Sequence, residues 1–160
     1  MKVAIIMGSN SDYPTMMEAE KILTEFDIAY ETKVMSAHRT PDLVIDFSKK
    51  ARDEGYGVII AAAGGAAHLA GVIASCTTLP VIGVPIKAKS LEGLDSLLST
   101  VQMPAGVPVA CVGINQAANA GLLAIQMLGI EDEIIMSKLD AYKLSLIAKV
   151  KNMKLEKGNQ

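Results

Sequence analysis

The stretch Val58-Ile59-Ile60-Ala61-Ala62-Ala63-Gly64-Gly65-Ala66-Ala67-His68 decides the fold of this 160-residue chain. Its first six residues are apolar without alternation, a pattern typical of a parallel strand that is covered on both faces. The strand then runs into a loop of small residues that ends at a histidine. We therefore expect a buried parallel sheet with a loop of chemical interest at the end of this strand.

Similar short apolar runs alternate with helical patterns on both sides of this stretch. We expect strands at 2–7, 28–35, 58–63, 81–84 and 107–112, and helices at 14–26, 41–54, 67–77, 93–101 and 116–128. This order predicts right-handed crossovers and a three-layer α/β/α fold around a parallel sheet. Ligands of such sheets bind beyond the carboxyl ends of the strands, here on the loops that start at Gly8, Ser36, Gly64 and Pro85.

The chain length and the lack of a linker or internal repeat predict a single domain over residues 1–160. We expect a core at 1–128 and a helical extension at 131–156, which begins acidic and ends basic as a helix dipole favours. This extension is a candidate subunit-contact arm. A hydrophobic content of 51% with only 20% charged residues also favours an oligomer, although an Ala-rich helical core is the alternative.

The composition excludes several classes of partner. A net charge of -2 and a pI near 5.7 argue against binding to nucleic acid or to an anionic membrane. No apolar stretch has membrane-spanning length and no signal peptide is evident, so we expect a soluble cytoplasmic protein. Cys76 and Cys111 lie far apart in apolar runs, and we interpret them as buried small hydrophobes rather than a metal pair or a disulfide.

The first candidate site segment is Gly8-Ser9-Asn10-Ser11-Asp12, which follows a strand and precedes a helix. Gly8 permits a tight turn, Ser9 and the helix amides can hold an anion, and Asp12 can accept hydrogen bonds from ribose hydroxyls. The alternative is that Asp12 caps the helix and the serines satisfy the turn. The segment matches neither the dinucleotide fingerprint nor the P-loop.

The second segment is Ser36-Ala37-His38-Arg39-Thr40-Pro41. Arg39 carries a permanent charge on a planar fork suited to phosphate or carboxylate, and His38 can take and give a proton near neutral pH. Thr40 and Pro41 predict a helix start, with Thr40 as the N-cap. The alternative is a surface His-Arg pair. Because positive charge opposes the dipole at a helix start, we favour a functional role.

The third segment is the Gly64–His68 loop. Small residues leave backbone amides exposed beside a cramped cavity, which can hold a carboxylate or a small neutral gas molecule. Close packing of the loop on a neighbouring helix is the alternative, with His68 as a satisfied core histidine. The sequence has no metal-ligand spacing around either histidine and no Gly-x-Ser-x-Gly elbow of a hydrolase.

These runs together resemble the PurE family of purine biosynthesis. The matching segments are 7–12, 36–41, 63–69, 93–97, 102–104 and 118–120. They occur in the same order as in the family, and the resemblance extends to about Leu128. The resemblance implies a flavodoxin-like fold and a homo-octamer with sites at subunit junctions. It also implies that no metal, biotin or other cofactor is needed, and it links the protein functionally to an ATP-dependent N5-carboxyaminoimidazole ribonucleotide synthetase.

Two activities share this family. One moves a carboxyl group of N5-carboxyaminoimidazole ribonucleotide from the exocyclic nitrogen to ring carbon 4, and the other carboxylates aminoimidazole ribonucleotide with carbon dioxide. The second type tends to carry Lys where Arg39 stands and a different loop at 64–68, so we expect the mutase. A non-catalytic nucleotide- or flavin-binding module is the rival, but it leaves His38 without a task.

The resemblance and the chemistry together imply roles for the candidate residues. His38 is the expected general acid and base around a bound molecule of carbon dioxide. Arg39, Ser9 and Ser36 are expected at the phosphate, and Asp12 at the ribose. The full set of expected substrate-binding residues is Gly8, Ser9, Asp12, Ser36, Arg39, Gly65, Ala66 and His68.

Overall fold

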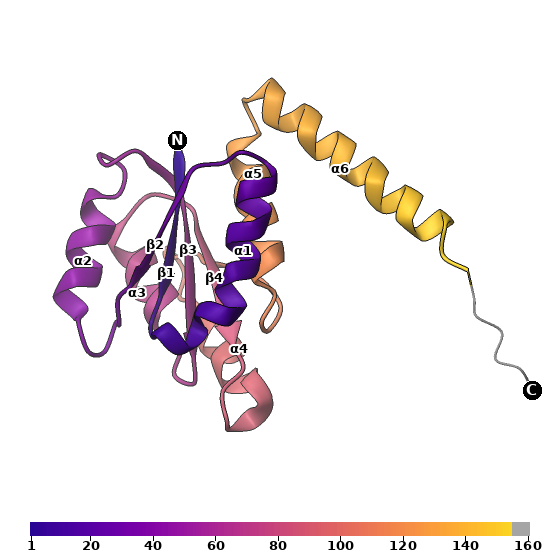
Figure 1. The fold of residues 1–160 in the computed structure, drawn as a ribbon. Helices are drawn as coiled ribbons and strands as arrows, with labels where there is room; N and C mark the ends of the chain where they lie inside the picture. The colour runs from indigo at the N-terminus through magenta and orange to yellow at the C-terminus, as the bar shows by residue number, and fades with distance from the viewer. Residues whose placement is uncertain (155–160) are drawn as a thin grey trace, which may run out of the picture.

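The computed structural model describes residues 1–154 and has a central sheet of five parallel strands (Figure 1). The strands are β1 Lys2–Met7, β2 Tyr30–Val34, β3 Tyr56–Gly64, β4 Val81–Ile86 and β5 Ala110–Cys111. The helices are η1 Asn10–Asp12, α1 Tyr13–Glu25, α2 Pro41–Lys50, α3 Leu69–Cys76, η2 Leu91–Gly93, α4 Leu94–Val101, α5 Ala117–Leu128 and α6 Glu133–Lys151.

Helices cover both faces of the sheet. Alternate residues of β1 enter different cores: Val3 and Ile5 pack with α1 and α5, whereas Ala4 and Ile6 pack with α2 and α3. All four side chains are fully buried. The central strands are apolar without interruption because helices cover both of their faces, as the sequence predicted. The predicted three-layer α/β/α fold is therefore confirmed.

The strand order β2-β1-β3-β4-β5 places a reversal at the centre of the sheet. From β1 the chain crosses to β2 on one side, and it then returns to β3 on the other side of β1. This is the flavodoxin-like order, in which a crevice opens beyond the carboxyl ends of the two strands at the reversal. Here those ends are Met7, at the end of β1, and Gly64, at the end of β3.

Several predicted boundaries differ from the structure. The strand predicted at 107–112 pairs only over Ala110–Cys111, because Pro108 has no N–H for the ladder. Cys76 and Cys111 are free but half-buried, so the expectation that both are buried is wrong. Helix α2 begins at Pro41 as predicted, but the Thr40 side chain makes no capping bond to it.

Helix α6 projects away from the body of the protein (Figure 1). It is anchored at its start: Lys138 Nζ donates to the Phe26 carbonyl at 3.0 Å and pairs with Asp27 Oδ2 at 2.8 Å. The Tyr142 ring also meets Phe26 edge-on, with ring centroids 5.5 Å apart. The helical extension was predicted at 131–156, but α6 is shorter and ends at Lys151. Residues 155–156 lie outside the described residues.

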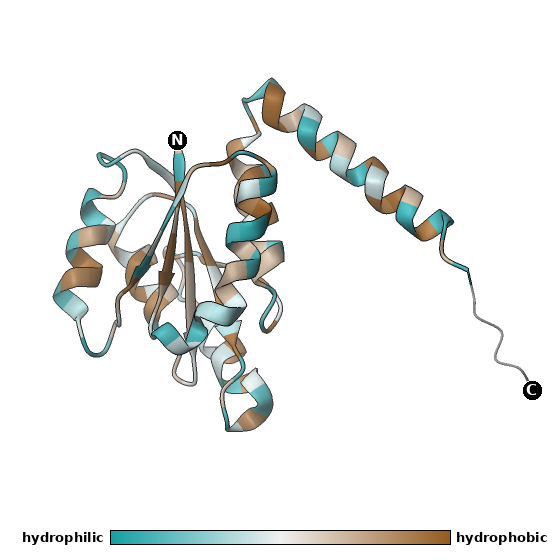
Figure 2. Ribbon diagram, viewed as in Figure 1, coloured by the Kyte–Doolittle hydropathy of each residue, from teal (hydrophilic) through white to brown (hydrophobic). Residues whose placement is uncertain are grey.

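Apolar residues recur along α6 (Figure 2). None of its residues is buried, and Ile134, Leu144 and Val150 are each more than 60% exposed. Exposed apolar surface of this kind commonly marks a site of association. Within residues 1–154, no helix has both the length and the apolar character needed to cross a membrane.

A polar cluster near the amino end of the sheet joins three strands through Glu31 on β2. The Glu31 carboxylate pairs with Lys2 of β1, accepts a hydrogen bond from the Tyr56 hydroxyl at 2.6 Å, and lies 3.2 Å from Lys33 Nζ. The bonds from Lys2, Tyr56 and Lys33 lower the pKa of Glu31 from 4.5 to about 2. This cluster favours the ionised carboxylate in the folded state.

We expect Glu31→Gln to lower the free energy of unfolding at neutral pH and to weaken its dependence on pH in acid. The folded-state pKa of Glu31 lies below its unfolded value, so its contribution is present above pH 4.5 and is lost as the pH falls towards about 2. Urea unfolding at several pH values measures this, with exposed Glu25→Gln as the control. A parallel pH dependence of the Glu31 variant and the wild type would contradict it.

Candidate active site

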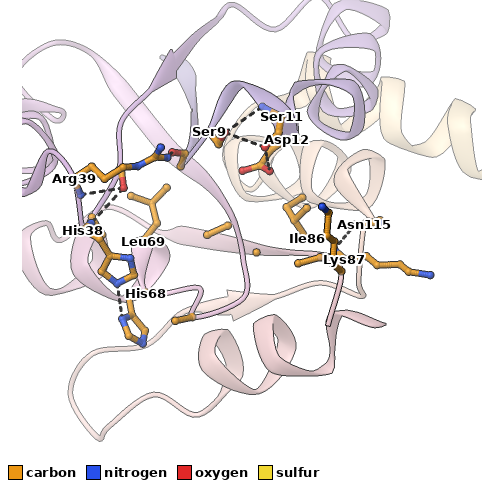
Figure 3. A pocket seen from close by; sticks show the side chains of 18 residues that line it. Ser9, Ser11, Asp12, His38, Arg39, His68, Leu69, Ile86, Lys87 and Asn115 are labelled. Atoms are coloured by element: carbon orange, nitrogen blue, oxygen red, sulfur yellow. Dashed lines mark hydrogen bonds between the residues drawn. The ribbon is translucent and has the colours of Figure 1, made fainter. Parts of the chain in front are cut away.

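A cavity of about 880 Å³ opens at the carboxyl edge of the sheet (Figure 3). It collects residues from the loops that follow β1, β2, β3 and β4, as the strand reversal predicts. The lining residues are Gly8, Ser9, Ser11, Asp12, Ser36, Ala37, His38, Arg39, Ala63, Gly64, Ala66, His68, Leu69, Ile86, Lys87, Ala88, Lys89 and Asn115.

The structure gathers nearly all of the sequence-predicted site residues around this cavity. Those that line it are Gly8, Ser9, Asp12, Ser36, His38, Arg39, Ala66 and His68. Gly65 is the exception. It turns the loop with a left-handed φ of +64°, and its carbonyl accepts a hydrogen bond from Ser99 Oγ at 3.3 Å. Gly65 therefore shapes the loop from outside the cavity wall.

The two histidines meet in the cavity although 30 positions separate them. His38 Nε2 lies 2.9 Å from His68 Nδ1, and the rings stand nearly perpendicular at 81°. One of the two nitrogens must donate and the other accept, so the rings share one proton along this line. His68 is exposed, which rules out the alternative of a satisfied core histidine. Two imidazoles in this contact can pass a proton along their hydrogen bond.

The turn that carries His38 is held by its own hydroxyls. Ser36 Oγ accepts hydrogen bonds from the backbone N–H groups of His38 at 3.3 Å and Arg39 at 3.2 Å. Thr40 Oγ1 in turn accepts from Ser36 N at 2.9 Å. This use of Thr40 explains why its side chain does not cap α2. These bonds fix the backbone that carries the His38 and Arg39 side chains.

Arg39 joins the loops after β1 and β2. Its Nη2 donates to the Gly8 carbonyl at 2.5 Å, and Gly8 N donates to the Ala62 carbonyl at 3.1 Å. A guanidinium group has five N–H donors, so this bond leaves others to meet an anion in the cavity. The side chain is exposed there, beside the serines of the first loop.

Asp12 lies at the floor of the first loop and is only 8% exposed. Its carboxylate accepts a hydrogen bond from Ser11 Oγ at 3.2 Å and makes no capping bond to α1. Burial raises the pKa of Asp12, although the bonds from Ser11 and Ser9 and the charge of Arg39 oppose the shift. The helix-cap alternative for Asp12 is therefore wrong, whereas Ser9 does satisfy the turn by accepting from Ser11 N at 3.3 Å.

The small-residue loop is tight on one side. A Cβ added at Gly64 would lie 3.2 Å from the Ile86 carbonyl, so this position packs closely on β4. Ala63, Gly64 and Ala66 nevertheless line the cavity beside His68. The loop therefore packs closely against the neighbouring strand on one side and lines the open cavity on the other.

Sequence reasoning missed the wall on the β4 side of the cavity. It pointed to a loop starting at Pro85 but singled out no residue there, and the structure adds Ile86, Lys87, Ala88, Lys89 and Asn115. The available signal was an Asn in a turn after a strand, a residue type that tolerates left-handed backbone. Within residues 1–154, no three His, Cys, Asp or Glu side chains gather as a metal site requires.

Residues 2–149 match the family described as AIR carboxylase. An N5-carboxyaminoimidazole ribonucleotide mutase of Pyrococcus horikoshii is 59% identical over 92% of this chain and 84% of its own length. The protein of the same name from Thermotoga maritima is 58% identical over 89% of this chain and 83% of its own length. A chloroplastic phosphoribosylaminoimidazole carboxylase of Vigna aconitifolia is 52% identical over 88% of this chain, which spans 25% of that protein.

Solved structures resemble the whole fold. Treponema denticola PurE superposes with a TM-score of 0.85 at 28% identity, over 92% of each chain. The structure of a PurE2 variant from the same organism gives the same TM-score at 27% identity, over 94% of each chain. Both superpositions cover at least 92% of the chain, so they include the sheet and the helices around it.

Proposed function

The chain belongs to the AIR carboxylase family, and we infer that it is an enzyme of purine biosynthesis, an N5-carboxyaminoimidazole ribonucleotide mutase. The observation that carries this inference is an identity of 59% with a relative of that name over nearly the whole chain. The resemblance to the PurE family read from the sequence is thus confirmed. The mutase moves a carboxyl group within one molecule and is therefore an isomerase.

We propose that the reaction proceeds through carbon dioxide held in the cavity. The bond between the exocyclic nitrogen and the carboxylate breaks, carbon dioxide is released, and the nitrogen gains a proton. Ring carbon 4 then forms a bond to carbon dioxide and loses its proton, which restores the aromatic ring. Proton gain and loss balance, so one acid/base group can serve both steps.

His38 is the group we assign to both proton transfers. Its contact with His68 at 2.9 Å supports this role, because the second ring orients the first and can share its proton. We place the carbon dioxide against the lining next to the pair, which consists of Ala63, Gly64 and Ala66. Holding the gas beside carbon 4 replaces a bimolecular encounter with a step inside one complex.

The remaining polar groups suit a ribonucleotide. We assign Arg39, Ser9 and Ser36 to the phosphate, since a guanidinium and hydroxyl groups are strong donors to phosphate oxygens. We assign Asp12 to a ribose hydroxyl. Its buried carboxylate accepts from Ser11 in the free protein, and a hydroxyl donor from the ribose would add to that bond.

The test is product formation by the pure protein at low bicarbonate. N5-carboxyaminoimidazole ribonucleotide should be converted to the carbon-4 carboxylated product, whereas aminoimidazole ribonucleotide should not. Product only from aminoimidazole ribonucleotide with added carbon dioxide would establish the carboxylase reaction named for the Vigna aconitifolia relative. A yellow, flavin-bound preparation without turnover would establish the binding module.

We also propose that the protein is a homo-octamer and that α6 contributes to its contacts. The exposed apolar side chains of α6 support association, because they have no cover in the single chain. Light scattering after size exclusion should give an octamer for the wild type. The double variant Leu144→Glu/Ile147→Glu should give smaller species, and the control Lys149→Glu on the same helix should stay octameric. An octameric double variant would contradict the role of α6.

The proposed cellular setting follows from the reaction. An N-carboxylate loses carbon dioxide readily, so we expect an ATP-dependent N5-carboxyaminoimidazole ribonucleotide synthetase to supply the substrate in the same compartment. We propose the cytoplasm. The two free cysteines support it, because reducing compartments keep thiols unpaired.

A further inference from the structure

One wall of the cavity has no part in the roles assigned above. It consists of Ile86–Lys89 and Asn115. Ile86, Lys87 and Asn115 lie across the cavity from the His38 and His68 pair (Figure 3). Asn115 follows β5 in the sequence, whereas the rest of the wall follows β4. The contacts of Asn115 indicate what holds this wall in place.

Asn115 connects the two loops through its backbone and its side chain. Its N–H donates to the Pro85 carbonyl at 2.9 Å, and its Oδ1 accepts from Lys87 N, also at 2.9 Å. Its backbone is left-handed, with φ +59°, a conformation that asparagine tolerates better than most residues. One residue thus takes the place of a neighbouring strand on both sides of Ile86 and extends the pairing of β4 beyond the end of β5.

Other contacts fix the end of β4 but do not extend to the loop residues after Lys87. Ser96 Oγ, which is fully buried, donates to the Ile86 carbonyl at 2.8 Å. Gly93 packs so closely that an added Cβ would lie 3.2 Å from Lys87 Cα. After Lys87 the chain passes through irregular backbone at 88–90 before η2 begins. The Asn115 bond therefore lies at the boundary between the fixed strand and the loop that lines the cavity.

We propose that Asn115 is a positioning residue for nucleotide binding, which holds the Lys87–Lys89 wall in the shape that receives the substrate. This inference rests on the proposed mutase function. A wall that is already ordered spares the substrate the free energy of ordering it on binding. Because the wall lies across the cavity from His38, loss of the bond should raise KM and leave kcat nearly unchanged.

Asn115→Gly is the direct test. Glycine adopts the left-handed backbone freely, so the bond to Pro85 can persist while the Oδ1 acceptor of Lys87 N is lost. We expect KM for N5-carboxyaminoimidazole ribonucleotide to rise roughly fivefold, the equivalent of one ordinary hydrogen bond. The value of kcat should stay within about a factor of two.

Two further variants separate positioning from a general loss of stability. Thr77→Val removes another side-chain oxygen that accepts a backbone N–H, that of Leu79 at 3.2 Å, outside the cavity lining. Its KM should equal that of the wild type. Asn115→Asp keeps an acceptor for Lys87 N. Measured in about 0.5 M salt, which screens the added charge, its KM should lie closer to the wild-type value than that of Asn115→Gly.

The outcomes distinguish this inference from the function beneath it. A wild type without mutase turnover would contradict both the proposed function and this inference. If the wild type is active and the Asn115→Gly variant has the same KM as the wild type, only the inference about Asn115 is contradicted. The inference would also be overturned if Thr77→Val raised KM as much, or if Asn115→Asp were as impaired as Asn115→Gly, since the lost acceptor at residue 115 would then not be the cause.

Discussion

Replacing His38 with asparagine should lower mutase turnover by roughly a hundredfold to ten-thousandfold, the usual contribution of a general acid/base group. Asparagine is close in size and keeps a hydrogen-bonding side chain, but it cannot accept and release a proton near neutral pH. The turn should persist, because Ser36 Oγ binds the backbone N–H groups of residues 38 and 39 rather than the imidazole. Single-turnover and steady-state rates measure the loss.

Binding of the carbon-4 carboxylated product provides the control for this variant. Calorimetry should give a dissociation constant within about fivefold of the wild-type value, since Arg39 and Asp12 are untouched and a neutral hydrogen bond is worth about 1 kcal/mol. A variant that binds product normally and turns over at nearly the wild-type rate would show that His38 does not carry the proton. A variant that fails to bind would instead place His38 among the binding groups.

The fold was largely predictable because its strongest signals are local. Buried parallel strands are apolar without interruption, as at 58–63, and such runs separated by helical patterns permit few topologies. The predicted element boundaries were wrong where the local sequence pattern and the tertiary contacts conflict. The residues around Cys111 have the composition of a strand, but Pro108 and the edge position leave only Ala110–Cys111 paired. Helix α6 ends at Lys151, ahead of the predicted limit, although the basic pattern continues.

The candidate site was predictable as a set of loops but not as a geometry. The topological rule brings the ends of β1, β2 and β3 together, so that Gly8, His38 and His68 were expected at one edge. The direct contact of the two imidazole rings depends on the turn held by Ser36 and on the order of strands β2-β1-β3. Asn115 was missed because its significance lies in a hydrogen bond to a residue 28 positions away.

Replacing Arg39 with lysine should weaken binding of the ribonucleotide substrate and product roughly tenfold to a hundredfold. Lysine keeps the positive charge but is a point donor, so it cannot span two phosphate oxygens as a guanidinium does. It would also lose the bond from Arg39 Nη2 to the Gly8 carbonyl, which links the first two loops of the cavity. Because both changes act on the phosphate side, the effect should appear mainly in KM.

The chain has one other arginine, and it provides a matched control. Arg52 lies away from the cavity, where its Nη2 donates to Thr78 Oγ1 at 3.0 Å and to the Thr78 carbonyl at 3.3 Å. Arg52→Lys should leave nucleotide binding unchanged, while Arg39→Lys weakens it. If the two variants bind the product equally well, the phosphate is not held by Arg39. The lysines of the opposite wall, Lys87 and Lys89, would then be the cations nearest the cavity to take its place.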